Sequence, residues 1–149
     1  MVKLKHRYFL IEACFETTYE KITQYDIINA IKDQVLQLYG DFGLGTMNSS
    51  FALSVSELGK GLVVLKVGIE SSNYLKGCIP FITKVGKASC ILRLLLETAS
   101  MRSIDKHLVK ISLNQLYDSL KKATTIKEKN EIQDAIIKVS GSNAERVRF

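Results

Sequence analysis

The sequence comprises 149 residues, of which 46% are hydrophobic, and it carries a formal net charge of +6. This length suits a compact fold with its own core, and the three cysteines lack the paired spacing of a zinc site. The composition therefore excludes a small disulfide-stapled scaffold and favours a reducing compartment.

Membrane insertion and a secretory leader are not expected. The best apolar stretches contain Lys66 and Arg93 and fall short of the roughly 20 residues that span a bilayer. Near the N-terminus, Glu12 and Glu16 interrupt the apolar run that a signal sequence needs. We expect a soluble protein with no membrane partner, whose first residues already belong to folded structure.

The first half of the chain predicts a strand, a helix and a hairpin. Residues 7–15 are rich in aromatic and aliphatic side chains and indicate a strand. Thr23 is a suitable cap for a helix, with Asp26 in its first turn and a stop at Gly40. Alternation at Phe51, Leu53 and Val55 predicts a second strand. The turn 59–61 is expected to lead into a central strand over residues 62–69.

The second half predicts a helix, a strand and further helices. Ser71 or Ser72 can begin a helix whose apolar residues recur at helical spacing as far as Val85. Pro80 is expected to bend this helix or to end its first part near Ile79. Residues 90–96 indicate a fourth strand.

Three helices are expected after the fourth strand, over about residues 100–110, 113–122 and 126–139. Ser112 with Gln115, and Thr125 with Glu128, have the capping-box spacing that predicts the last two helix starts.

This order of elements predicts an α+β fold of the ferredoxin-like or RRM-like split βαβ (βαββαβ) type. Such a fold has an antiparallel sheet with two helices on one face, and C-terminal helices follow it here. We expect residues 1–122 to form a single domain that includes the first added helices. Residues 123–149 are expected to form a C-terminal helical extension with a frayed tail.

Catalytic and metal-binding motifs are not found in the sequence. The segment Gly40 to Gly45 resembles a phosphate-binding loop, but it follows a helix, so we expect an ordinary loop with glycines at positive φ. The only histidines, His6 and His107, belong to no motif. Residues 13–19 lack the glycines of an acylphosphatase cradle. We expect no catalytic residues, no metal ligands and no cofactor bound by the protein itself.

The charge is distributed unevenly along the chain. Residues 17–59 are mildly acidic, whereas residues 81–110 hold six cations against Glu97 and Asp105. This asymmetry favours a polyanionic partner. The six cations are Lys84, Lys87, Arg93, Arg102, Lys106 and Lys110.

The cationic N-terminus ends in aromatic rings, so it can neutralise phosphates and stack on bases. An alternative interpretation is an edge strand whose lysines keep it soluble. The third strand carries no ring, so RNA contacts would use this N-terminal segment or the segment from Ser100 to Lys106. That second segment is equally well interpreted as a solvated helix start.

The chain from Met1 to about Leu120 resembles the Pop-five type of small protein subunit of archaeal and eukaryotic ribonuclease P and eukaryotic ribonuclease MRP. The family usually has glycine where this chain has Ala99. The resemblance rests on short segments in a fixed order: residues 1–8 with Glu12, the loop 39–43, residues 61–65, residues 80–83 and residues 99–103.

The resemblance implies a non-catalytic RNA-binding subunit that stabilises the catalytic RNA core. In that family the RNA binds Mg²⁺ and processes tRNA 5′ leaders, or rRNA precursors, and the protein pairs with a TIM-barrel-like subunit and other subunits. Nuclear or nucleolar localisation is implied for a eukaryotic source, which we favour, and cytoplasmic localisation for an archaeal one. The implied RNA contacts are Lys3, Lys5, His6, Arg7, Tyr8, Arg102 and Lys106.

Two alternatives remain open at this point. A ferredoxin-like protein-interaction or regulatory module would have no RNA role. A free-standing RNA chaperone would bind varied RNAs without a stable protein partner.

Overall fold

The first strand, β1 (His6–Phe15), lies inside the sheet between β3 (Leu62–Gly68) and β5 (Ala88–Thr98). The computed structural model describes residues 5–16, 22–49, 54–57 and 61–146, without the side chains of 54–57 and 142–146. Within these residues, the strand predicted over residues 7–15 is confirmed.

The first helix, α1 (Gln24–Ser49), begins at the predicted cap. The backbone N–H and the hydroxyl of Thr23 donate to Asp26 Oδ2 at 2.8 and 2.7 Å, and the Asp26 N–H donates back to Thr23 Oγ1 at 3.3 Å. These reciprocal bonds satisfy groups that the first helical turn leaves unpaired. The backbone N–H of Thr23, followed by its hydroxyl, lowers the pKa of the Asp26 carboxyl.

The helix breaks at Gly40 and then resumes. Gly40 has φ 67° and ψ −162°, values that glycine adopts without steric conflict. Helical structure then continues to Ser49, so the expected loop over residues 40–45 is wrong beyond its first residue. Of the three glycines in this segment, only Gly40 has a positive φ.

Tyr39 joins the break in α1 to α2 (Ser72–Cys78). Its ring meets the Tyr74 ring edge-on, with centroids 4.8 Å apart and an interplanar angle of 68°. A Cβ at Gly43 would lie 2.5 Å from Tyr39 Cβ, and a Cβ at Gly77 would lie 1.9 Å from Tyr39 Oη. Gly43 and Gly77 therefore allow close packing, and we call this cluster of four residues the Tyr39 joint.

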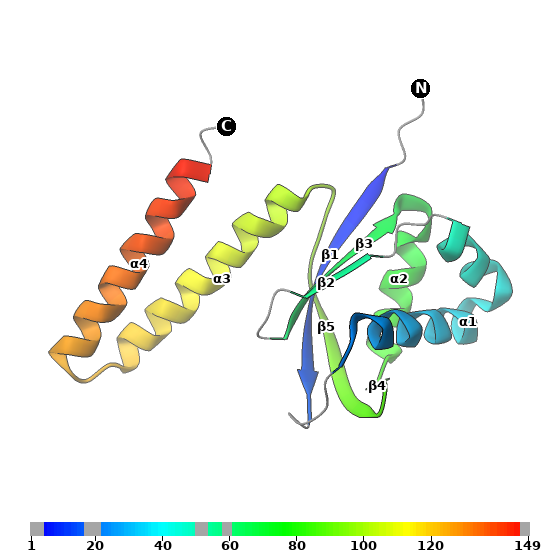
Figure 1. Cartoon of the computed structure of the whole chain (residues 1–149), viewed down its shortest axis with the longest axis horizontal. Helices are drawn as coiled ribbons and strands as arrows, with labels where there is room; N and C mark the ends of the chain where they lie inside the picture. Colours follow the sequence, from blue (N-terminus) through cyan, green and yellow to red (C-terminus); the bar gives the residue numbers. More distant parts are fainter. Residues whose placement is uncertain (1–4, 17–21, 50–53, 58–60, 147–149) are drawn as a thin grey trace. The chain divides into compact units, whose positions relative to one another are not determined.

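The sheet has the strand order β2–β3–β1–β5, followed at the edge by the short strand β4 (Lys84–Val85), and every neighbouring pair is antiparallel. The strand β2 (Ser54–Glu57) forms the predicted hairpin with β3, although Phe51, Leu53, Gly59 and Lys60 lie outside the described residues. Helices α1 and α2 cover the same face of the sheet (Figure 1). The predicted ferredoxin-like split βαβ fold is confirmed.

The second helix is shorter than its apolar periodicity predicted. A 3₁₀ turn, η1 (Ile69–Ser71), precedes α2, and a second one, η2 (Ile79–Phe81), follows it. Pro80 lies in η2, which agrees with the expected helix end near Ile79. The helical interpretation of residues 82–85 was wrong, because Ile82 is extended and Lys84–Val85 forms the short strand β4, paired with β5.

The core lies between the sheet and the two helices. Alternate residues of the three inner strands face α1 and α2, among them Phe9, Leu65 and Leu92. Ile31 of α1 and Leu75 of α2 are fully buried opposite them. The pairing of β1 with β5 shifts between Leu10 and Ile11, so the side-chain alternation of β5 changes at that point.

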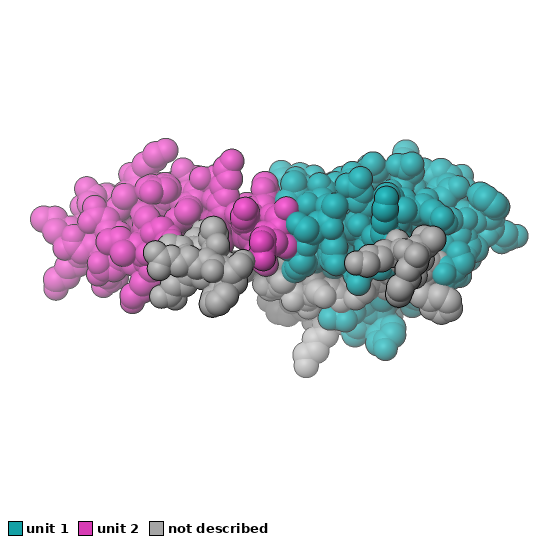
Figure 2. Space-filling view, turned by 90° about the horizontal axis from the view of Figure 1, so that it is seen from above, with its two compact units in different colours: residues 1–101 teal, residues 102–149 magenta. Residues whose placement is uncertain are grey.

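The C-terminal helices are α3 (Met101–Lys122) and α4 (Ile126–Arg146). The predicted helix start at Ser112 was wrong, because Ser112 lies inside the continuous α3, whereas α4 begins directly after Thr125 as expected. The chain divides into two compact units, residues 1–101 and 102–149, coloured separately in Figure 2. The expected division after residue 122 remains a prediction.

Candidate nucleic-acid interface

The start of β1 is fixed by pairing with β3. The Ile69 N–H donates to the Lys5 carbonyl oxygen at 3.0 Å, and His6 is paired with Gly68. The Lys5 side chain is exposed at this end of the sheet. Lys3, the first residue of the predicted contact set, lies outside the described residues.

The predicted contact residues of β1 do not share one face. Successive side chains of a strand point to opposite sides, and Phe9 and Ile11 belong to the core beneath the helices. Arg7 therefore lies on the helix-covered face, whereas His6 and Tyr8 lie on the other face. All three side chains are half-buried, so the Arg7 guanidinium and the Tyr8 ring are positioned by a paired strand and not by a free tail.

The sheet adds Lys66, a cation that sequence reasoning had not included. Tyr8 is paired with Lys66 on β3 and with Thr98 on β5, so the three residues share the face away from the helices. Lys66 is half-buried, and no ion pair joins it, Lys5 or Arg7 to the residues described. In the sequence, Lys66 could have been recognised as a candidate because it is the only charged residue in the otherwise apolar run 62–68.

His6 adds an unsatisfied polar atom to the same face. Its Nδ1 is buried, and no hydrogen-bond partner for it is found in the described part of the chain. A buried polar atom without a partner is unfavourable, so a hydrogen-bonding group supplied by a bound molecule would stabilise this position.

Farther along the same face the charges are neutralised. Glu12 and Arg93 are cross-strand neighbours and form an ion pair between Glu12 Oε2 and the Arg93 guanidinium. At the end of β5 on the opposite face, Lys76 Nζ lies 3.1 Å from Glu97 Oε2. Lys5, Arg7 and Lys66 thus form a group of cations without a carboxylate partner among the described residues, located around the beginning of β1.

Arg102 and Lys106 belong to the second compact unit. They are four residues apart in α3, so they lie on one side of that helix, and both are exposed. Before them, the Ser100 N–H donates to Thr98 Oγ1 at 3.4 Å. The helix start predicted near residue 100 is confirmed, while phosphate contact by these side chains remains a prediction.

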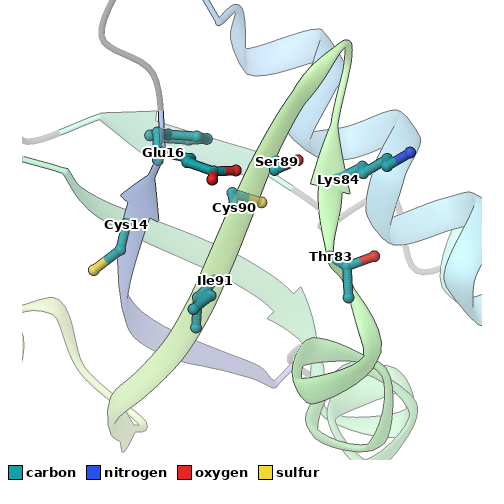
Figure 3. Close-up of a pocket in the computed structure, with 8 residues that line it drawn as sticks. Cys14, Glu16, Thr83, Lys84, Ser89, Cys90 and Ile91 are labelled. Atoms are coloured by element: carbon teal, nitrogen blue, oxygen red, sulfur yellow. The ribbon is translucent and has the colours of Figure 1, made fainter.

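A shallow hollow of about 580 Å³ lies near the far end of β1, between Cys14 and β4 (Figure 3). Cys90 lines it, and burial raises the pKa of the Cys90 thiol, which disfavours the nucleophilic thiolate. No histidine lines the hollow to act as a base. The hollow therefore lacks the paired groups of a nucleophilic active site.

The described residues lack both a metal site and a membrane-spanning helix. They contain no group of three His, Cys, Asp or Glu side chains placed to hold a metal ion. None of their helices is long and apolar enough to cross a bilayer.

The described elements thus form a split βαβ domain whose first strand begins with the cations Lys5 and Arg7. The profile of the Rpp14/Pop5 family matches residues 7–109. The chain belongs to the Rpp14/Pop5 family, as the resemblance in its sequence indicated.

Individual relatives extend the similarity over most of the chain. The ribonuclease P/MRP protein subunit POP5 of Bos taurus is 27% identical over 144 residues, covering 93% of this chain and 85% of the relative. The POP5 subunit of Homo sapiens is 25% identical, covering 91% of this chain and 87% of its own length. That of Danio rerio is 25% identical, covering 94% and 88%.

A solved structure shares the fold. A chain in the cryo-EM structure of yeast ribonuclease MRP superposes with a TM-score of 0.51 at 15% sequence identity, covering 83% of this chain and 99% of that chain. At this level of identity the match supports the fold and not the individual contacts.

Proposed function

We propose that this chain is a protein subunit of a ribonuclease P or MRP type ribonucleoprotein, where it binds and stabilises the catalytic RNA without cleaving RNA itself. Membership of the Rpp14/Pop5 family and the names of its relatives support this assignment. In such an assembly the RNA would hold Mg²⁺ and hydrolyse the precursor.

The observation that carries the proposal is the set of cations around the beginning of β1. Lys5, Arg7 and Lys66 have no carboxylate partner among the described residues, whereas Arg93 is paired with Glu12. Cations without such partners are free to neutralise phosphates and to release their counterions. Tyr8 lies next to Lys66 and supplies a ring for stacking or a hydroxyl for hydrogen bonding.

The proposed RNA-contacting residues are drawn from each of the two compact units. It keeps the residues that the sequence suggested and adds Lys66. Its members are Lys3, Lys5, His6, Arg7, Tyr8, Lys66, Arg102 and Lys106.

The remaining assignments follow from the same proposal. A TIM-barrel-like protein subunit and other proteins of the complex would be its partners, and the nucleus or nucleolus would be its compartment. The relatives POP5 of Bos taurus and Homo sapiens are eukaryotic, which supports the eukaryotic alternative.

The test is the salt dependence of RNA binding by the full-length chain. We expect Lys5→Ala and Arg7→Ala each to weaken binding of ribonuclease P RNA and to flatten the slope of log K against log salt by about one unit per lost phosphate contact. Lys87→Ala is the matched control, since Lys87 is exposed at the turn before β5, whose first residues pair with the far end of β1. Unchanged slopes for the first two variants, or an equal change for the control, would overturn the contact assignment.

The non-catalytic role has a separate test. RNA-free protein incubated with precursor tRNA and Mg²⁺ should release no 5′ leader. Leader release by such a preparation would contradict the proposal.

A further inference from the structure

A polar groove lies between α1 and the chain that leads into β4. Its volume is about 480 Å³, and one of its walls is a single face of α1. The helical spacing of Asn29, Asp33, Gln34 and Gln37 places them along that face. The opposite wall is built by residues 82–86, including Lys84. The groove lies entirely within the first compact unit.

The main chain of Lys84 points away from β5. Val85 is paired with Ala88 across a two-residue turn, and the Cys90 N–H donates to the Thr83 carbonyl at 2.9 Å. In an antiparallel pair, hydrogen-bonded and non-hydrogen-bonded positions alternate, so Lys84 between them is non-hydrogen-bonded. Its N–H and C=O are therefore directed to the outer edge of β4, the last strand of the sheet.

The groove offers further hydrogen-bonding groups. Hydrogen bonds to the side-chain amides of Asn29, Gln34 and Gln37 are not found within the described part of the chain. Each amide has both donors and an acceptor, which is the pattern that a peptide backbone matches. An open strand edge beside such amides is suited to an added extended chain.

The charged residues that line the groove favour a positively charged ligand. Asp26 and Asp33 line it against the single cation Lys84. Hydrogen bonds from Thr23 keep the pKa of Asp26 low, so this carboxyl stays ionised. A carboxylate-lined groove repels a phosphate backbone and attracts a basic peptide.

We propose that this groove binds an extended, basic segment of a partner protein, which pairs with the Lys84 main chain and places a lysine or arginine near Asp33. This is a protein-docking surface, and none of the proposed RNA contacts lines it. The inference does not depend on the proposed RNA role, so either can fail alone.

The test uses NMR of the isotopically labelled full-length chain with one defined probe, the blocked peptide Val-Lys-Val-Lys-Val-Lys-Val. We expect the peptide to shift the backbone amide of Lys84 and the side-chain amides of Gln34 and Gln37. Asp33→Asn should weaken binding by about two- to fivefold, as expected for one exposed charge pair. Glu70→Gln, a neutralised exposed carboxylate outside the groove, should leave binding unchanged.

Two control probes make the result decisive. The same peptide with alternate peptide nitrogens methylated loses the donors that strand pairing needs, and its binding should be lost. Oligouridine should leave the groove signals unshifted. Peptide shifts confined to other surfaces, equal binding of the methylated peptide, or a preference of the groove for oligouridine would each overturn the proposal.

Discussion

Gly77→Ala tests whether the Tyr39 joint is as tightly packed as the structure indicates. The new methyl group would lie 1.9 Å from Tyr39 Oη, so the tyrosine must move. Overpacking of this kind destabilises a fold by about 1–3 kcal/mol, and alanine returns roughly 1 kcal/mol of helix propensity. We expect a net loss of about 1 kcal/mol in the free energy of unfolding, measured by urea titration with circular dichroism.

A second background isolates the contact. Tyr39→Phe removes the oxygen, after which the nearest ring atom to the new methyl is Cζ at 3.1 Å, a tight but adjustable approach. In this background Gly77→Ala should be neutral or stabilising, with a coupling energy of about 1–2 kcal/mol between the two positions. An equal loss in both backgrounds would refute the packing argument.

Three further predictions concern the fold. Gly40→Ala should destabilise the chain by about 1–3 kcal/mol in urea titrations, because φ 67° with ψ −162° is a backbone conformation that essentially only glycine adopts. Nothing lies within 4 Å of the added Cβ, so the backbone alone accounts for the cost, and a neutral result would contradict this. Maleimide at pH 8 should label exposed Cys14 quickly and Cys78 only after unfolding, since burial raises the pKa of the Cys78 thiol to about 12. Equal labelling rates for the two cysteines in the folded protein would contradict the buried position of Cys78. The lowered folded-state pKa of Asp26 contributes stability that is present above its ordinary value of 3.8 and is lost as the pH falls through the folded-state value. Thr23→Ala should raise the Asp26 pKa in an NMR titration and reduce the acid sensitivity of folding, and an unchanged pKa would count against the capping account.

Local signals predicted the parts of the fold that depend on short-range chemistry. The cap formed by Thr23 and Asp26 and the four main strands are encoded in contiguous patterns. The segment 40–45 was misinterpreted because glycine satisfies two different needs: Gly40 supplies a positive φ, while Gly43 supplies room for Tyr39. The contact between Gly43 and Tyr39 is local, but the Tyr39 ring itself packs on Tyr74 of α2, a long-range contact that a local sequence window does not contain.

Errors at Val85 and Ser112 have similar origins. The apolar spacing up to Val85 matches a helix, but Pro80 has already ended that helix. Val85 is instead part of the extended strand β4, and its side chain is buried in the core. Ser112 satisfies the capping-box pattern, yet α3 continues through it. In both places tertiary packing decides between two locally acceptable conformations.

The candidate site was only partly predictable. The cations Lys5 and Arg7 were evident in the sequence. The placement of Arg7 on one face of the sheet and of His6 and Tyr8 on the other follows only from the parity of β1, which the core residue Phe9 sets. Lys66 could be added only once the register placed it beside Tyr8. Pairing of Arg93 with Glu12 also depends on register, and it removes one cation from the basic block 81–110.

The RNA that accompanies the protein in its own cell tests the central claim most directly. The tagged full-length chain should be isolated from native extract at moderate salt, and its RNA should be sequenced against an untagged control. The account predicts strong enrichment of the catalytic RNA of ribonuclease P or MRP, reduced when Lys5, Arg7 and Lys66 are all replaced by alanine. Recovery of no RNA, or of a mixture that mirrors the total RNA of the cell, would contradict it.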